Sequence, residues 1–600
     1  MGLLLLSACQ TVDPCTGPQH LWSAGDPAGP VHQFPDDAWT VADSSSPTGL
    51  RVNLPQSVLD AVPEAMAGMV APVNERSGAG RLGAILMEFD GQLGEIPQSA
   101  EQSLEDAGLM LVDLETGERQ AYQAHLWNGA TVLEVQPLAP LAPGHRHAVV
   151  LTRDHSSATG RCIVPDAELS ALLEGEGTEP GTATYSTLPE ELGLEPWEIS
   201  AATVFTTQDS LAGLAEIGAQ AAARTLDWEE APTCEPYESG RLCRGSFRAD
   251  DHRIAGGLLS PDIQGTHLLQ VNVYLPDRGD PAPFFLYGHG LGSSRSGGGW
   301  AFRRTADLGF AVLSVDALEH GDHPTAADAS DSDATAFLGI TLSPLGMDGQ
   351  ALLHNFLQTN LERLQAVALL MAHPDVDGDG TDDLDTGRFA YVGVSLGGLL
   401  GAGFMAQSDQ VQAAAIPLAG GHLATFAQEN EFMAILTSGV QNELATDADY
   451  RRVLSMAQTA LDPADPAVWA AHVRSERLDS ATPPHLLMPV STWDTVVPVT
   501  AGEYMARGLD LPLLQPQVHP VSGLRTGPSA PVSANEDGLT AGLFQFDRAT
   551  DDGEVIPSSH GELIGLEEGQ LQLRHYLQTW EQTGVPEVLD PYAELGTPAL

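Results

Sequence analysis

The stretch RFAYVGVSLGGLLG, residues 388–401, is the strongest indication of the fold. Residues 389–392 form an apolar run typical of a buried strand, and residues 398–403 form a small-residue run suited to a closely packed helix. Between them lies a G-x-S-x-G sequence with Ser395 at its centre, whose glycines permit a tight turn without Cβ clashes. Such a turn exposes the hydroxyl and points the Leu396 N–H at a developing oxyanion. A glycine-rich turn with a bystander serine is the alternative that this string alone leaves open.

The composition excludes several classes of function. A chain of 600 residues is too long for one core, and its 42% hydrophobic and 18% charged residues are ordinary for a globular protein. It carries 81 acidic residues against 26 basic ones, a formal net charge of -55, and every basic residue is arginine. We therefore expect no nucleic-acid partner and no electrostatic docking to anionic lipid. The absence of lysine excludes a lysine base, a Schiff base and a P-loop.

The first residues, MGLLLLSACQ, carry a second signal. The run Leu6-Ser7-Ala8-Cys9 resembles the lipobox of bacterial lipoproteins, which implies that residues 1–9 are the remnant of a signal sequence and that Cys9 is lipidated. The apolar run is too short to span a bilayer and lacks a basic n-region. We expect an extracytoplasmic protein whose only attachment to a membrane is this anchor. A short apolar N-terminus by chance is the alternative.

The remaining four cysteines are an even number, which suits an oxidising compartment. Cys234 and Cys243 are close in sequence, with a proline and a glycine between them, and are predicted to pair. Cys15 and Cys162 then form the second pair. Unpaired, buried thiols are the alternative.

Composition and periodicity divide the chain further. Residues 10–49 are rich in Pro, Gly, Asp and Ser and are predicted to be a flexible lead-in. Residues 50–164 contain short alternating runs typical of β-structure, and their segment LEVQPLAPLAPGHRHAVVLTRD resembles bacterial immunoglobulin-like modules, so we expect a small β-sandwich. Residues 165–260 are interpreted as a connecting segment with one helix. Residues 261–600 alternate strand and helix, which predicts a mostly parallel sheet, with a helical cap at 423–480.

The motifs YGHGLG (residues 287–292) and GVSLGG (residues 393–398), followed by a late aspartate and histidine, identify a family. Residues from about 265 to 600 resemble an α/β-hydrolase, and more narrowly the secreted bacterial lipases and esterases that carry an immunoglobulin-like N-terminal domain on a lipoprotein. The resemblance covers over half of the chain. It implies the chain order nucleophile, acid, histidine.

Four further residues complete the predicted catalytic machinery around Ser395. Asp494 follows an apolar strand in HLLMPVSTWD and is predicted to be the orienting acid, with a turn-forming role as the alternative. His560, after the last predicted strand, is the predicted base, and His519 is the alternative base. By analogy with the family, the N–H of Leu291 joins that of Leu396 in the oxyanion hole, while His289 orients this loop.

An acidic stretch precedes the predicted elbow strand. DVDGDGTDDLD, residues 375–385, matches the first half of an EF-hand calcium loop, with glycine at the sixth position. Position twelve is Thr386 instead of glutamate, which weakens the match. The predicted Ca²⁺ ligands are Asp375, Asp377, Asp379, Thr381 and Asp383. A solvated acidic turn is an equal alternative.

Together these features predict a serine hydrolase that cleaves carboxylic esters through an acyl-enzyme, with an ester or lipid molecule as substrate. Catalysis should need no cofactor, and a Ca²⁺ ion would be structural only. Two alternatives are a peptidase of the same fold and a non-catalytic surface binding protein with a vestigial hydrolase domain. Turnover of short acyl esters and labelling by a fluorophosphonate separate these three.

Overall fold

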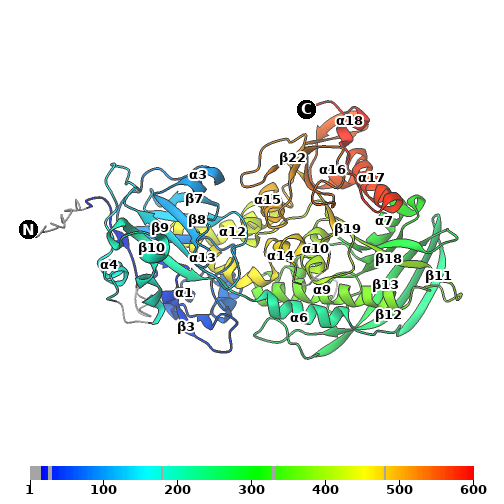
Figure 1. The fold of residues 1–600 in the computed structure, drawn as a ribbon. Helices are drawn as coiled ribbons and strands as arrows, with labels where there is room; N and C mark the ends of the chain where they lie inside the picture. The colour runs from blue at the N-terminus through cyan, green and yellow to red at the C-terminus, as the bar shows by residue number, and fades with distance from the viewer. Residues whose placement is uncertain (1–14, 24–29, 177–179, 327–332, 479–480) are drawn as a thin grey trace, which may run out of the picture. The chain divides into compact units, whose positions relative to one another are not determined.

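The computed structural model describes residues 15–23, 30–176, 180–326, 333–478 and 481–600 (Figure 1). The chain divides into two compact units, and each is built from separated segments. The first unit comprises Met1–Val41, Ala84–Gln136 and His145–Thr206. The second comprises Ala42–Gly83, Pro137–Gly144 and Thr207–Leu600.

The first unit contains two antiparallel sheets. One has the order β1-β5-β8-β7, with β2 also paired to β5, and the other has the order β10-β9-β6. The strands of the first sheet are β1 (His20–Leu21), β2 (Gln33–Phe34), β5 (Ile85–Phe89), β7 (Tyr122–Trp127) and β8 (Val132–Pro137). Those of the second are β6 (Leu109–Asp113), β9 (Arg146–Thr152) and β10 (Ile199–Thr206). The immunoglobulin-like character of this unit stays a prediction.

The structure corrects the predicted domain boundaries. Residues 10–49 are not a flexible lead-in throughout, because β1 and β2 within them pair with β5. Residues 50–164 do not form one domain, since their first part belongs to the second unit. Residues 165–260 are more than a connecting segment, because they supply β10 to the first unit and two strands to the main sheet of the second. Strand pairing over long sequence distances, invisible to local composition, causes these differences.

An eleven-stranded mixed sheet is the centre of the second unit, in the order β11-β12-β13-β15-β14-β18-β19-β20-β23-β21-β22. From β15 to β22 neighbouring strands are parallel, while β11, β12 and β13 pair antiparallel. This mostly parallel sheet agrees with the α/β-hydrolase prediction. The bounds are β11 (Glu230–Tyr237), β12 (Gly240–Asp251), β13 (Gly265–Pro276), β14 (Ala282–Gly288), β15 (Ala311–Val315), β18 (Leu384–Gly393), β19 (Ala413–Ala415), β20 (His485–Ser491), β21 (Leu513–Gln515), β22 (Thr526–Ser529) and β23 (Ala541–Phe546).

Successive side chains of a strand point to opposite faces of the sheet, and here both faces are buried in a core cluster. On β14, Phe284 and Leu286 join one core cluster and Phe285 and Tyr287 join the other. Residues of α6, α9, α10, α14 and α15 complete the first cluster, and residues of α7 and α17 complete the second. These helices are α6 (Leu211–Ala222), α7 (Gly298–Thr305), α9 (Gly349–Ala372), α10 (Leu396–Gln407), α14 (Pro466–Arg474), α15 (Val499–Gly508) and α17 (Glu567–Thr583). Figure 1 shows α6 and α9 running beside β12 and β13.

The insertion between β19 and β20 is mostly helical over residues 423–478, in agreement with the prediction for 423–480, of which residues 479 and 480 lie outside the described part of the chain. It contains α11 (Leu423–Glu429), α12 (Glu431–Glu443), α13 (Asp447–Leu461) and α14. Both predicted disulfides are present, Cys15–Cys162 in the first unit and Cys234–Cys243 across the β11–β12 hairpin. None of the helices in the described part of the chain is long and apolar enough to cross a membrane.

Candidate active site

Ser395 lies between the end of β18 and the start of α10, as the sequence predicts. Its backbone has φ 55° and ψ −118°, a conformation that costs a non-glycine residue strain energy. The Ser395 N–H donates to Pro417 O at 3.2 Å, and the Leu399 N–H donates to Ser395 O at 3.0 Å. The surrounding backbone thus holds the strained turn and leaves the side chain half-buried at the carboxyl end of the strand.

Close backbone packing explains the glycines of this turn. A Cβ on Gly397 would lie 2.0 Å from Gly288 O, and one on Gly393 would lie 2.4 Å from Gly397 O. The Tyr391 hydroxyl also donates to Gly397 O at 2.5 Å. Any side chain at these positions would push α10 away from β14, so the glycines are needed to place the serine.

The structure brings Ser395, His560 and Asp494 together from three distant parts of the chain. His560 Nε2 lies 3.0 Å from Ser395 Oγ, and His560 Nδ1 lies 2.7 Å from Asp494 Oδ2. His560 is the first residue of α16 (His560–Gly565), and Asp494 follows β20. Both distances are within the range for a nucleophile, a base and its orienting acid.

Asp494 is held in one orientation by the backbone that follows it. Its Oδ1 accepts the N–H groups of Val496 at 2.8 Å and Val497 at 2.9 Å. The residue is buried, with 7% of its surface exposed. Because one carboxylate oxygen is occupied in this way, the other is directed at His560 Nδ1, which fixes the ring proton on that nitrogen.

The loop after β14 reaches Ser395 from the other side. A Cβ on Gly290 would lie 3.7 Å from the Ser395 Cβ, so the loop backbone passes close to the hydroxyl. Leu291 and Leu396 line one cavity together with Ser395. Within the described residues, neither the Leu291 N–H nor the Leu396 N–H has a protein acceptor. Both donors are therefore available to a ligand oxygen, as an oxyanion hole requires.

Two buried histidines support this loop. His289 Nδ1–H donates to Gly290 O at 3.0 Å, and His289 Nε2 accepts the Ala317 N–H at 3.0 Å. Burial lowers the pKa of His289 to about 3, which keeps its ring neutral and able to accept. His320 Nε2 accepts the Gly292 N–H at 3.1 Å. These hydrogen bonds agree with the prediction that His289 orients the loop, and His320 is fully buried beside it.

A cavity of about 300 Å³ adjoins Ser395. Its walls are almost entirely apolar and come from the loop after β14, from α10, from the helical insertion and from the segment after Asp494. The cavity is lined by Leu291, Leu396, Leu399, Leu423, Phe426, Phe432, Met433 and Val497, among others. Sequence periodicity could not identify this set, since its members come from parts of the chain that are far apart in sequence. Leu291 and Phe432 are also partly exposed, at 38% and 44%, so the cavity has an apolar rim.

His519, the alternative base, lies elsewhere. Its Nε2 is 3.1 Å from Glu503 Oε1 and 3.4 Å from Gln545 Nε2. Among the described residues, His560 Nε2 is the atom that accepts the hydrogen bond of the Ser395 hydroxyl. The geometry therefore favours His560 as the base.

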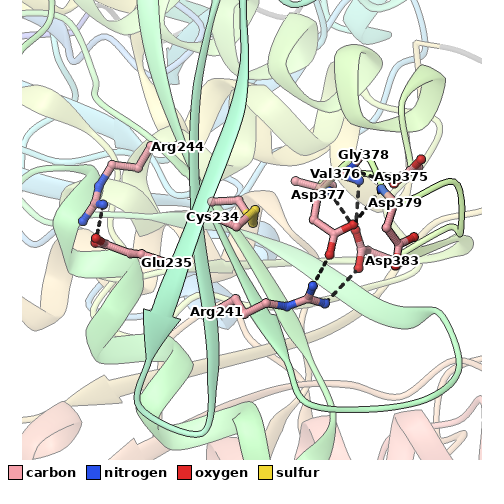
Figure 2. The surroundings of a disulfide bond; sticks show 11 residues. Cys234, Glu235, Arg241, Arg244, Asp375, Val376, Asp377, Gly378, Asp379 and Asp383 are labelled. Atoms are coloured by element: carbon pink, nitrogen blue, oxygen red, sulfur yellow. Dashed lines mark hydrogen bonds and ion pairs between the residues drawn. A yellow bond between two sulfur atoms is a disulfide. The ribbon is translucent and has the colours of Figure 1, made fainter.

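In the acidic loop 375–385, carboxylate oxygens accept hydrogen bonds from backbone N–H groups of the same loop (Figure 2). Asp375, Asp377 and Asp383 each offer a carboxylate oxygen, and these three oxygens lie within 4.8 Å of one another. Arg241, beside the Cys234–Cys243 disulfide in Figure 2, donates to Asp377 and, at 3.2 Å, to Asp383. A guanidinium thus already neutralises part of this cluster.

The other two predicted Ca²⁺ ligands, Asp379 and Thr381, are not part of this cluster of carboxylate oxygens. Asp379 Oδ1 accepts the Thr381 N–H at 2.8 Å, and both residues are exposed. Arg241 could not be predicted as a partner of this loop, because it lies 136 positions from Asp377 in the chain.

Comparisons with known proteins give structural likeness only. No family model matches the chain, and no curated protein matches its sequence. An acetyl xylan esterase from Thermoanaerobacterium sp. is 14% identical over 53% of this chain and 86% of its own, with a TM-score of 0.34. An esterase from Pyrobaculum calidifontis is 17% identical over 62% and 91%, with a TM-score of 0.30. The Pyrococcus horikoshii acylaminoacyl peptidase is 13% identical over 60% and 49%, with a TM-score of 0.32.

Likenesses this weak say nothing about the substrate of the present chain. They include both esterases and a peptidase, so the chemistry rests on the site itself.

Proposed function

We propose that this protein is a serine hydrolase that cleaves carboxylic esters through an acyl-enzyme intermediate. The observation that carries the proposal is the hydrogen-bonded series from Ser395 Oγ to His560 Nε2, 3.0 Å, and from His560 Nδ1 to Asp494 Oδ2, 2.7 Å. A serine hydroxyl is a weak nucleophile until such a base removes its proton.

In the proposed reaction, His560 takes the Ser395 proton as Oγ attacks the ester carbonyl carbon. The oxygen of the tetrahedral intermediate accepts hydrogen bonds from the N–H groups of Leu291 and Leu396. The intermediate then collapses, and His560 gives its proton to the departing alcohol while the acyl group stays on Ser395. Water, deprotonated by His560, releases the acid by the reverse sequence. Asp494 stabilises the imidazolium in both halves.

The apolar cavity favours an ester with a hydrocarbon acyl group over a peptide. A peptide substrate brings backbone N–H and C=O groups that need partners when they are desolvated. The walls beside Ser395 offer few polar groups, of which Asn430 and Thr335 are two. A peptidase thus fits the same catalytic residues but not the adjoining surface.

The test combines a covalent probe with turnover. A fluorophosphonate should label Ser395 in the wild-type protein and fail to label Ser395→Ala, because only an activated serine reacts. Nitrophenyl acyl esters should be hydrolysed, and aminoacyl nitroanilides should not. Absence of labelling would support the vestigial binding protein, and cleavage of the anilides alone would support the peptidase.

Two further parts of the proposal concern ions and location. We propose that the loop 375–385 binds one Ca²⁺ with a purely structural role, through the oxygens of Asp375, Asp377, Asp379, Thr381 and Asp383. The converging carboxylates support this, and Arg241 opposes it by competing for Asp377 and Asp383.

We also propose an extracytoplasmic protein anchored by lipid on Cys9, a residue outside the described part of the chain. The two disulfides support an oxidising compartment. Mass spectrometry of the protein expressed with its leader should find acylated Cys9, whereas an unmodified Met1 in a cytosolic fraction would contradict the anchor.

A further inference from the structure

A cluster of two histidines and a glutamate lies in the second unit, apart from the acidic loop. His267 comes from β13, His323 from the segment after β15, and Glu362 from α9. Their side chains are buried, with 9%, 0% and 1% of their surfaces exposed. One ligand atom from each lies within 4.8 Å of the other two.

We propose that His267, His323 and Glu362 form a binding site for one Zn²⁺ ion or a similar divalent transition metal. Two imidazole nitrogens and one carboxylate are a donor set that zinc favours. His267 Nδ1 lies 2.6 Å from Glu362 Oε1, and His323 Nε2 lies 3.0 Å from Glu362 Oε2. Zinc bonds of about 2.1 Å place tetrahedral ligands about 3.4 Å apart, so small side-chain rotations bring these atoms around a common ion.

The second nitrogen of each histidine also has the kind of partner that metal-bound histidines have. His267 Nε2 faces Asp251 Oδ2 at 3.4 Å, and His323 Nδ1 faces Thr325 Oγ1 at 2.8 Å. A metal-bound imidazole donates its other N–H to a carboxylate, a backbone carbonyl or a water, which orients the ring and raises its basicity. The carboxylate beside His267 is of this kind, and the threonine hydroxyl offers an equivalent acceptor.

The buried charge of Glu362 is a third reason to expect a bound cation at this cluster. Glu362 is a fully buried carboxylate, and within the described residues its ion pairs are with His267 and His323 only. Gln358 Nε2 donates to Glu362 Oε1 at 3.2 Å. A buried charge is costly unless it is well compensated, and a divalent cation held between these three side chains would compensate the carboxylate directly.

Without an ion, the same atoms form a hydrogen-bonded network. Arg253 NH2 lies 3.0 Å from His267 Nε2, and the Thr325 N–H lies 3.1 Å from His323 Nδ1. In that arrangement the protons are on the nitrogens that face Glu362. Metal binding requires the opposite tautomers, with lone pairs toward the ion, and the displaced protons then face Asp251 and Thr325. The two states exclude each other, so they can be told apart by experiment.

The site also has a structural consequence. His323 lies three residues after His320, whose Nε2 accepts the Gly292 N–H beneath the oxyanion loop. An ion bound between α9, β13 and His323 would therefore fix the segment that supports this loop. It would stabilise the loop without touching the reacting atoms.

The experiment measures metal in the purified full-length protein after zinc loading and exhaustive dialysis. We expect about one equivalent of zinc per chain in the wild type, and less than about a tenth of an equivalent in Glu362→Gln, which keeps the size of the side chain. The matched control is His519→Gln, which removes a histidine that contacts Glu503 elsewhere and should keep the full equivalent. Asp251→Asn should weaken zinc affinity about 10- to 100-fold.

Cobalt distinguishes this site from acidic surface groups, which offer oxygen ligands only. Co²⁺ bound by two imidazoles in a low-coordinate site should give strong visible absorption that Glu362→Gln lacks and His519→Gln retains. If Glu362→Gln fails to fold, anomalous scattering at the zinc edge from wild-type crystals decides. A wild-type protein with no zinc and no cobalt spectrum, or with binding that Glu362→Gln leaves unchanged, would establish the hydrogen-bonded network instead.

Discussion

Replacing Asp494 by asparagine tests the geometry of the proposed catalytic residues most directly. Asp494 Oδ1 accepts two backbone N–H groups, from Val496 and Val497, at 2.8 and 2.9 Å. In Asp494→Asn the amide oxygen must keep that position, because an NH₂ group there would face two donors. The amide NH₂ is then directed at His560 Nδ1. The ring must accept at Nδ1 and carry its proton on Nε2, facing Ser395 Oγ.

A histidine in this tautomer cannot remove the serine proton. The equivalent change in a serine protease lowers kcat by about 10⁴, which corresponds to about 5.5 kcal/mol of activation free energy. The two backbone donors hold the amide in its inactive orientation here, so we expect a loss of similar size. Packing should be unaffected, since the two side chains have the same shape.

The assay is kcat/KM for a nitrophenyl acyl ester at neutral pH, together with the rate of fluorophosphonate labelling and the melting temperature. Glu431→Gln is the matched control. It removes a neighbouring carboxylate, which accepts a hydrogen bond from Thr495 Oγ1 at 2.8 Å, without contacting His560. We expect this control to stay within about threefold of the wild type. Asp494→Asn activity within tenfold of the wild type, with an unchanged melting temperature, would refute the tautomer argument.

Three other outcomes follow from the structure. His320→Phe keeps a ring but removes the acceptor for the Gly292 N–H, so kcat per fluorophosphonate-reactive serine should fall at least tenfold with little change in KM; a loss that disappears once the rate is divided by the number of reactive serines would indicate misfolded protein instead. If the loop 375–385 binds Ca²⁺, about ten millimolar calcium should raise the melting temperature over that in EGTA, and Arg241→Gln should enlarge the rise by freeing two carboxylates; equal curves in both media would leave an acidic turn. Burial lowers the pKa of His422 to about 4, so the unfolded state binds more protons than the folded state between pH 6.5 and 4. The free energy of unfolding therefore decreases as the pH is lowered through that window. His422→Gln should remove about 2 kcal/mol of the loss between pH 7 and 5, measured by urea unfolding, and an unchanged difference would contradict a neutral buried ring.

The sequence alone was sufficient where function depends on local geometry. A strand, two glycines around Ser395 and a small-residue helix specify the elbow, because the turn tolerates no Cβ at those positions. The order of nucleophile, acid and histidine came from the resemblance to the α/β-hydrolases, in which parallel strands bring the carboxyl ends that carry these residues to one edge of the sheet. This is why Asp494 and His560 could be predicted although 165 residues separate Ser395 from His560.

Tertiary structure decided everything that depends on pairing between distant segments. Residues 165–260 looked like a connector because no local pattern states which strand β12 will join. Arg241 neutralises an acidic loop more than a hundred positions away, and His267 meets Glu362 across 95 positions. A lone buried histidine or glutamate has no periodicity to mark it. The role of such a side chain depends on which other charged groups are buried beside it, and only the tertiary packing determines those neighbours.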